Sequence, residues 1–152
     1  MADGITFAVE NWHDVKDEAL PLLIRHWEEI AADKAEIPLA IDYASYDAME
    51  AAGSLHILVA RKNGAMVGYY CTVIRSHLHY VTTLFAFTDI FYIAPEHRGG
   101  AGIAMFREIE KSLKELGVKK FFSASKPWLD VGPLFERLGY TKHEVVYSKM
   151  IG

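Results

Sequence analysis

Residues 89–106 read DIFYIAPEHRGGAGIAMF, and this stretch decides the fold. An apolar run ends at Pro95, three glycines follow within the four residues 99–102, and an amphipathic pattern begins after them. This order predicts a strand, a tight turn and the first turn of a helix. Backbone N–H groups at such a junction converge on one point, where the helix dipole adds positive potential. The junction therefore suits a bound pyrophosphate, although a tight turn that caps an ordinary helix would carry the same glycines.

Upstream of this junction, the sequence predicts a short strand followed by two helices. The strand is ITFAVENW, residues 5–12, where apolar and polar residues alternate. The helices begin at Asp14 and Asp42, both placed as N-caps. Pro21 lies inside the first helical pattern, where it predicts a kink or the first turn of a second segment.

The middle and the end of the chain complete the predicted fold. Two β-rich runs over residues 54–74 meet at Asn63-Gly64, which is typical of a two-residue hairpin, and a third run covers residues 82–94. The remaining predicted elements are a helix over 101–117, a strand over 119–125, a helix over 133–139 and a strand over 142–151. We therefore expect an α/β (α+β) fold in one domain over residues 1–152, in the order β-α-α-β-β-β-α-β-α-β. Its mixed, mostly antiparallel sheet of about six strands has helices on both faces.

Composition narrows the function classes. The 152 residues carry a net charge of −4 and no basic run longer than Lys119-Lys120, which argues against nucleic acid as a partner. No apolar stretch is long enough to cross a bilayer, and the first residues lack a secretory pattern, so we expect no membrane partner. The single cysteine, Cys71, lies in a strand-like run typical of a small buried side chain, and it fits a reducing, cytoplasmic location.

Several motifs together resemble the GNAT superfamily of N-acetyltransferases. Residues 89–106 resemble its coenzyme A loop, Arg/Gln-x-x-Gly-x-Gly/Ala after a strand that ends near a Pro-Glu pair, and PLFERLGY (133–140) resembles its late-helix signature. The element order is similar to that fold over nearly the whole chain. The stretches LLIRHWEEIA, EIPL, SHLHY and VVYSKMI resemble a subgroup common in bacteriophage and prophage genomes. The resemblance implies transfer of an acetyl group from acetyl-CoA to a primary amine of a small molecule, peptide or protein, by direct attack on the thioester. No metal is expected. A homodimer is one assembly in which such a protein would act.

The resemblance also assigns contacts with acetyl-CoA. Placing Gly100 and Gly102 on the two family glycines puts His97 at the basic position, whereas counting from Pro95 puts Arg98 there; a one-residue deletion reconciles the two registers. The strand before the loop is expected to meet the oxyanion through its main chain. The assigned residues are Phe91, Ile93, Arg98, Gly99, Gly100, Ala101, Gly102 and Ile103.

Proton transfer needs an acid for the leaving thiolate and a base for the amine. The family's late helix often carries the acid, a Tyr four residues before its Gly, but Phe135 stands there in this chain. Tyr147 and Tyr140 are the nearest alternative acids, although a thiolate can also leave unaided. Asp89 is charged inside an otherwise apolar strand, which fits a general base, acting directly or through water, and equally a structural carboxylate.

The acceptor has its own candidate residues, which we expect around the first helix and the connection after the hairpin: Glu28, Glu29, Glu36 and Tyr80. His77 and His79 alternate at a strand end and therefore share one face. These two imidazoles fit an acid/base pair or aromatic packing better than a metal site, because no third ligand has convincing spacing.

Two other function classes compete with the enzyme. Phe135 and the altered loop would also suit a non-catalytic module that keeps the fold and binds a host protein. A metal-dependent hydrolase built on His77, His79 and Asp89 is the third interpretation. Acyl-CoA binding, thiol release and metal content separate the three.

Overall fold

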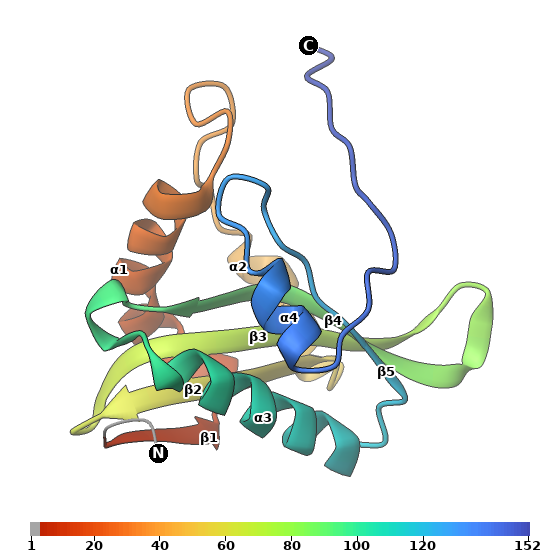
Figure 1. Cartoon of the computed structure of the whole chain (residues 1–152), viewed down its shortest axis with the longest axis horizontal. Helices are drawn as coiled ribbons and strands as arrows, with labels where there is room; N and C mark the ends of the chain where they lie inside the picture. Colours follow the sequence, from red (N-terminus) through yellow and green to blue (C-terminus); the bar gives the residue numbers. More distant parts are fainter. Residues whose placement is uncertain (1–3) are drawn as a thin grey trace.

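The computed structural model describes residues 4–152, and its strands form one sheet in the order β1-β2-β3-β4-β5 (Figure 1). The strands are β1 (Ile5–Val9), β2 (Leu55–Lys62), β3 (Ala65–His77), β4 (Tyr80–Ile93) and β5 (Lys120–Phe122). The first four pair antiparallel, each with its neighbour in the chain, and β5 pairs parallel with β4. The sheet is therefore mixed and mostly antiparallel, as predicted.

Helices cover both faces of the sheet, which confirms the predicted layers. They are α1 (Trp12–Ile30), α2 (Tyr43–Ala51), α3 (Gly100–Glu115) and α4 (Gly132–Arg137), with a 3-10 turn, η1 (Pro95–His97), before α3. Figure 1 shows α3 and α4 in front of the sheet. Side chains of α3 pack on Leu58 and Tyr70, whereas those of α1 pack on Ile57 and Tyr69. Neighbouring strand residues thus face opposite cores, as the two-residue repeat of a strand requires.

Local signals in the sequence explain several element ends. Asn63 and Gly64 have φ values of 51° and 83°, the positive angles that a two-residue hairpin turn needs. Asp42 caps α2, because its carboxylate accepts a hydrogen bond from the backbone N–H of Ser45 at 3.0 Å. Asp14 is not the cap of α1; the helix begins at Trp12, and it runs through Pro21 without a break.

The prediction of about six strands is wrong by one. Residues 142–151 were expected to form a closing strand, but they have no helix or strand structure. Their apolar side chains are exposed instead, by 82% for Val146 and 95% for Ile151, and Figure 1 shows this C-terminal segment extending away from the sheet. Alternating apolar residues favour a strand, but a strand forms only where a partner edge is available. The adjacent β5 offers just three paired residues.

Candidate active site

The glycine loop, residues 98–102, follows β4 and η1 and includes the first turn of α3. Gly99 has a φ of 115°, a conformation that only glycine adopts without strain, and α3 begins at the next residue. A Cβ atom added at Gly100 or Gly102 would meet no other atom within 4 Å, so neither glycine is needed for packing inside this chain. The open space lies at a helix N-terminus, where N–H groups lack intrahelical acceptors. The loop therefore has the shape and polarity to hold a diphosphate.

Arg98, expected to bind that diphosphate, is paired with a carboxylate on α1. Its two terminal nitrogens donate to the two oxygens of Glu29, both at 2.7 Å, and its Nε donates to the carbonyl of Ile93 at 2.8 Å. The guanidinium also lies over the ring of Tyr92. The hydrogen bonds from Arg98 lower the pKa of Glu29. Glu29 had been a candidate for acceptor binding; in the structure it is the counter-ion of the loop arginine.

A second ion pair joins α1 to η1, the turn that precedes this loop. Both terminal nitrogens of Arg25 donate to Glu96 of η1, at 3.0 and 2.8 Å. These bonds hold the pKa of Glu96 down to about 2. Two ion pairs therefore tie the last turns of α1 to the segment before α3. In one the helix supplies the arginine, and in the other the helix supplies the carboxylate.

Strands β4 and β5 diverge just before the loop. They pair over Phe85–Phe87 and Lys120–Phe122 and no further, so that in the described residues 88–93 of β4 have no strand partner on this side. At the point of divergence, the Tyr70 hydroxyl lies 2.9 Å from the hydroxyl of Thr88 on β4 and 3.0 Å from that of Ser123 after β5. Phe91, one of the two predicted main-chain contacts, stacks on the Tyr70 ring. The open edge leaves backbone groups of β4 available to a ligand.

Asp89 occupies a β-bulge in β4. Its neighbours Thr88 and Ile90 pair with Thr72 and Cys71 of β3, and Asp89 itself has no partner, which makes it the extra residue. Its carboxylate accepts a hydrogen bond from the Tyr46 hydroxyl of α2. The bulge thus turns an exposed carboxylate toward the α1–α2 side of the sheet. Sequence reasoning named Asp89 but missed Tyr46, which looked like an ordinary residue of a short helix.

A cavity of about 540 Å³ lies between the sheet and the first two helices, and we call it the α1–α2 cavity. Its walls come from α1, the segment 31–42, α2, strands β2 to β4, the loop after β5 and Ser148 of the C-terminal segment. Tyr46 and Ile90 both line it, so Asp89, bonded to the first and adjacent in sequence to the second, lies at its edge. The Trp128 indole closes one side by donating to the carbonyl of Ile30 at 2.9 Å.

His26 of α1 lines the cavity and was not singled out in the sequence. Its side chain is buried, Nδ1 lies 2.9 Å from the Tyr69 hydroxyl, and the ring stacks on Tyr92 at 4.8 Å. Burial lowers the pKa of His26 to about 4, so the imidazole is neutral at physiological pH. One signal could have found it: His26 falls on the apolar stripe of α1, four residues after Leu22.

The predicted acceptor residues do not gather around Asp89. His77, His79 and Tyr80 lie at the β3–β4 hairpin, and Tyr80 precedes Asp89 by nine positions, or about 30 Å of strand. The two imidazoles touch edge to face at 5.2 Å, and the backbone N–H of His79 donates to Nδ1 of His77, which is a local packing contact. Glu28 and Glu36 are exposed, on α1 and in the loop after it. Within residues 4–152 no group of three metal-ligating side chains occurs.

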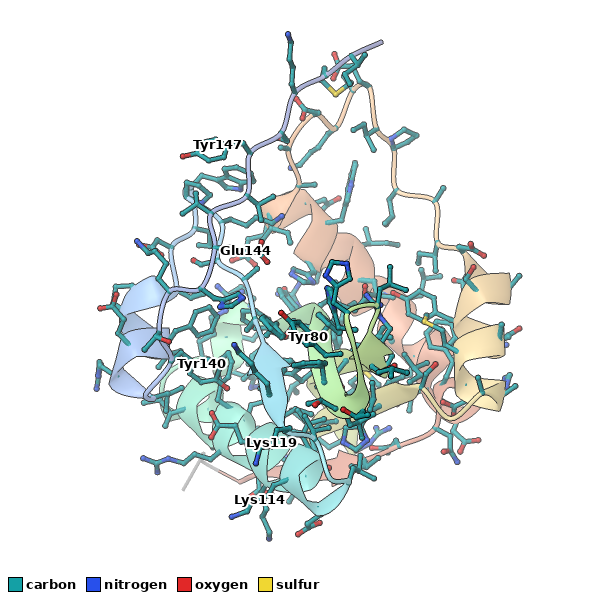
Figure 2. The ribbon with its side chains drawn as sticks, turned by 90° about the vertical axis from the view of Figure 1, so that its right-hand side faces the viewer. Tyr80, Lys114, Lys119, Tyr140, Glu144 and Tyr147 are labelled. Carbon is teal, nitrogen blue, oxygen red and sulfur yellow. The ribbon has the colours of Figure 1, made fainter. Side chains whose placement is uncertain are left out.

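The two candidate acids, Tyr147 and Tyr140, lie in different parts of the fold. Tyr147 is 89% exposed on the C-terminal segment, and Figure 2 shows it well separated from the hairpin that carries Tyr80. Phe135 of α4 is buried, with its ring 5.5 Å from that of Tyr140. Burial raises the pKa of Tyr140, as does the nearby Glu110 carboxylate. A phenol in this aromatic cluster therefore holds its proton firmly.

An acyl-CoA could lie along the open edge of β4 with its diphosphate at the glycine loop, which points to the class of acyl-CoA-dependent acyltransferases. Residues 12–140 match the model of the Acetyltransferase (GNAT) family. The chain belongs to this family, whose members are acyl-CoA-dependent N-acetyltransferases. No curated protein matches the sequence. No helix in the described part of the chain is both long and apolar enough to cross a membrane.

Solved structures share the fold at low sequence identity. An aminoglycoside acetyltransferase from an uncultured soil metagenomic sample, in complex with sisomicin, is 12% identical with a TM-score of 0.74, covering 98% of this chain and 97% of its own. A ribosomal-protein-alanine N-acetyltransferase from Brucella melitensis biovar Abortus 2308 is 18% identical with a TM-score of 0.69, covering 97% and 99%. A predicted acetyltransferase with acetyl-CoA from Clostridium acetobutylicum is 14% identical with a TM-score of 0.67, covering 96% of both chains.

Proposed function

We propose that this protein transfers the acetyl group of acetyl-CoA to a primary amine held in the α1–α2 cavity. One observation carries the proposal: the β4 segment 88–93 has an open edge toward β5, a bulge carboxylate toward the cavity, and the glycine loop at its end. A thioester along the open edge and an amine beside Asp89 would then meet at the same strand. Such positioning of two reactants supplies much of the rate of an acyl transfer.

The glycine loop binds the diphosphate of acetyl-CoA through its backbone. The contacts assigned to it are Gly99, Gly100, Ala101, Gly102 and Ile103, and Arg98 adds its charge once it leaves Glu29. Main-chain groups of Phe91 and Ile93 face the pantetheine and the thioester carbonyl along the open edge. An N–H group there would stabilise the oxyanion that forms when the amine attacks.

Asp89 acts on the amine. An ammonium ion must lose one proton before its nitrogen can attack, and the exposed carboxylate accepts that proton directly or through a water molecule. The nitrogen then bonds to the carbonyl carbon, the carbon–sulfur bond breaks, and the second amine proton leaves as the thiolate takes up a proton. With Phe135 at the position of the family acid, this proton comes from solvent or from the nitrogen of the tetrahedral intermediate, since coenzyme A thiolate is a good leaving group.

The test measures thiol release and binding together. The Asp89→Asn variant should bind acetyl-CoA with unchanged heat in calorimetry, and it should lose at least about tenfold in kcat as expected for a general base. Asp17→Asn, which removes an exposed carboxylate from α1, is the matched control and should keep full turnover. Acetyl-CoA binding without thiol release from any amine would favour the non-catalytic module instead.

We further propose a homodimer. Of the strands in residues 4–152 only β4 pairs with β5, and the exposed segment 141–152, with apolar side chains such as Val146 and Ile151, follows in the chain. A second copy that covers this segment and the β5 edge would bury both, which is the usual remedy for an open edge. Sedimentation should give twice the chain mass of 17.1 kDa, and removal of residues 144–152 should give the monomer. A full-length monomer would contradict the proposal.

We infer a cytoplasmic location from Cys71, the free and buried single cysteine. The sequence motifs favour the subgroup common in bacteriophage and prophage genomes, and the neighbouring genes of the source genome would test that origin. The whole chain of residues 1–152 is proposed to act as one acetyltransferase domain.

A further inference from the structure

The α1–α2 cavity is lined mostly by apolar and aromatic side chains. All three tryptophans of the chain face it: Trp12, Trp27 and Trp128. Further apolar residues complete its walls: Val15, Leu23, Ile30, Leu39, Ile57 and Val59. Its volume of about 540 Å³ is that of a small-molecule site. The walls therefore favour a ligand with a substantial apolar body.

Charged groups in the cavity walls are few, and they offset one another. Of the described lining residues only Asp42 is acidic and only Lys126 is basic. Both carboxylate oxygens of Asp42 already accept hydrogen bonds from Ser45, at 3.0 and 2.6 Å. His26, the imidazole in the wall, is uncharged at physiological pH because burial lowers its pKa to about 4. The carboxylate of Asp42 is thus held at the N-terminus of α2, and Lys126 matches its charge in the described walls.

At the edge of the cavity, Asp89 is the carboxylate that belongs to β4, the strand along which the thioester is proposed to lie. From this asymmetry we infer that the acceptor is a primary amine with a single positive charge on an apolar, aromatic or branched body. This inference rests on the proposed acetyl transfer. The ammonium lies beside Asp89, and the body fills the space between the tryptophans. A second ammonium on that body would lose its hydration without gaining a partner, which is a large penalty in an apolar site.

A matched pair of amines tests the charge count. Para-methylbenzylamine and para-xylylenediamine have the same ring and nearly the same length, but the second carries a charged aminomethyl group where the first has a methyl group. Thiol release from acetyl-CoA should give a kcat/KM at least about tenfold higher for the monoamine, because an unpaired buried charge costs more than one factor of ten. Sisomicin, a polycation, should be poorer still. Equal or higher kcat/KM for the diamine or for sisomicin would overturn the inference and leave acetyl transfer standing.

A pair of variants tests whether the cavity is responsible. Leu39 lines the cavity and is 39% exposed, so Leu39→Glu adds a carboxylate to the wall at little cost in folding. This variant should shift the preference toward the diamine. Ile37→Glu changes the same loop at a residue that does not line the cavity, and it should leave the preference unchanged. Identical preferences in both variants would show that the acceptor binds elsewhere.

Tryptophan fluorescence gives a reading that does not depend on turnover. Since all three indoles line the cavity, para-methylbenzylamine added to the protein with coenzyme A should change the emission, and the diamine should do so only at much higher concentration. A fluorescence change without thiol release from acetyl-CoA would keep the ligand class and refute acetyl transfer. No change with the monoamine would overturn the ligand class.

Discussion

Replacing Glu29 with glutamine should tighten the binding of acetyl-CoA. Arg98 is the one basic side chain expected to bind the diphosphate, yet Glu29 holds its guanidinium through two hydrogen bonds of 2.7 Å. A diphosphate and Glu29 would compete for the same two nitrogens. Glutamine keeps the length of the side chain but removes its charge, so that Arg98 is released more easily.

The size of the effect follows from the exposure of the pair. The side chains are 41% exposed for Arg98 and 25% exposed for Glu29, so solvent screens much of their attraction. We therefore expect a contribution of about 0.5–1 kcal/mol, which corresponds to a dissociation constant lower by roughly two- to fivefold. The Nε bond from Arg98 to the Ile93 carbonyl survives the change and keeps the arginine near the loop.

Glu96→Gln is the matched control, because it removes the same charge from the same region while its partner is Arg25. Calorimetry of acetyl-CoA binding at constant ionic strength compares the wild type, Glu29→Gln, Glu96→Gln and Arg98→Ala. Competition for Arg98 requires a tighter complex for Glu29→Gln alone and a weaker one for Arg98→Ala. Equal gains in both glutamine variants would indicate general repulsion between carboxylates and phosphate. Weaker binding in Glu29→Gln would show that Glu29 positions Arg98 for the diphosphate.

Three further predictions concern single side chains. His26 has a pKa of about 4 in the folded chain against 6.5 unfolded, so the unfolded state takes up the proton first as pH falls. The free energy of unfolding should therefore drop by about 3 kcal/mol between pH 7 and pH 4. In urea titrations, His26→Gln should remove this dependence on pH. Tyr70→Phe should cost about 1–3 kcal/mol, measured by thermal unfolding, because the hydroxyls of Thr88 and Ser123 lose their shared partner. Tyr147→Phe should leave kcat unchanged, since that side chain is 89% exposed; a large loss would establish it as the proton donor.

The sequence predicted the fold well where local signals and core periodicity agree. The Asn63-Gly64 turn, the Asp42 cap and the glycine junction before α3 all appear in the structure. The C-terminal strand failed because its apolar alternation says nothing about whether a partner edge exists. The edge available to a further strand depends on the length of β5. The sequence pattern predicts this strand over 119–125, but it covers only Lys120–Phe122.

The candidate site could be predicted only in part, for a related reason. A glycine loop and a lone aspartate in an apolar strand are visible along the chain, and Asp89 was found in this way. The bonds from Tyr46 to Asp89 and from Arg98 to Glu29 join residues 43 and 69 positions apart. Such pairs depend on how α1 and α2 pack on the sheet. No spacing rule within a single helix or strand reports that arrangement.

The two ion pairs of α1 connect the glycine loop with the α1–α2 cavity. Arg25 and Glu29 hold η1 and the glycine loop, while His26 and Trp27, on the same turns of the helix, line the α1–α2 cavity. A diphosphate that takes Arg98 from Glu29 releases one of these ties and changes the charge beside the cavity wall. We therefore expect occupation of the loop to alter the free energy of binding in the cavity, and by reciprocity an acceptor to alter the affinity for acetyl-CoA. The coupling would vanish in Glu29→Gln, where the tie is already weakened, and persist in Glu96→Gln.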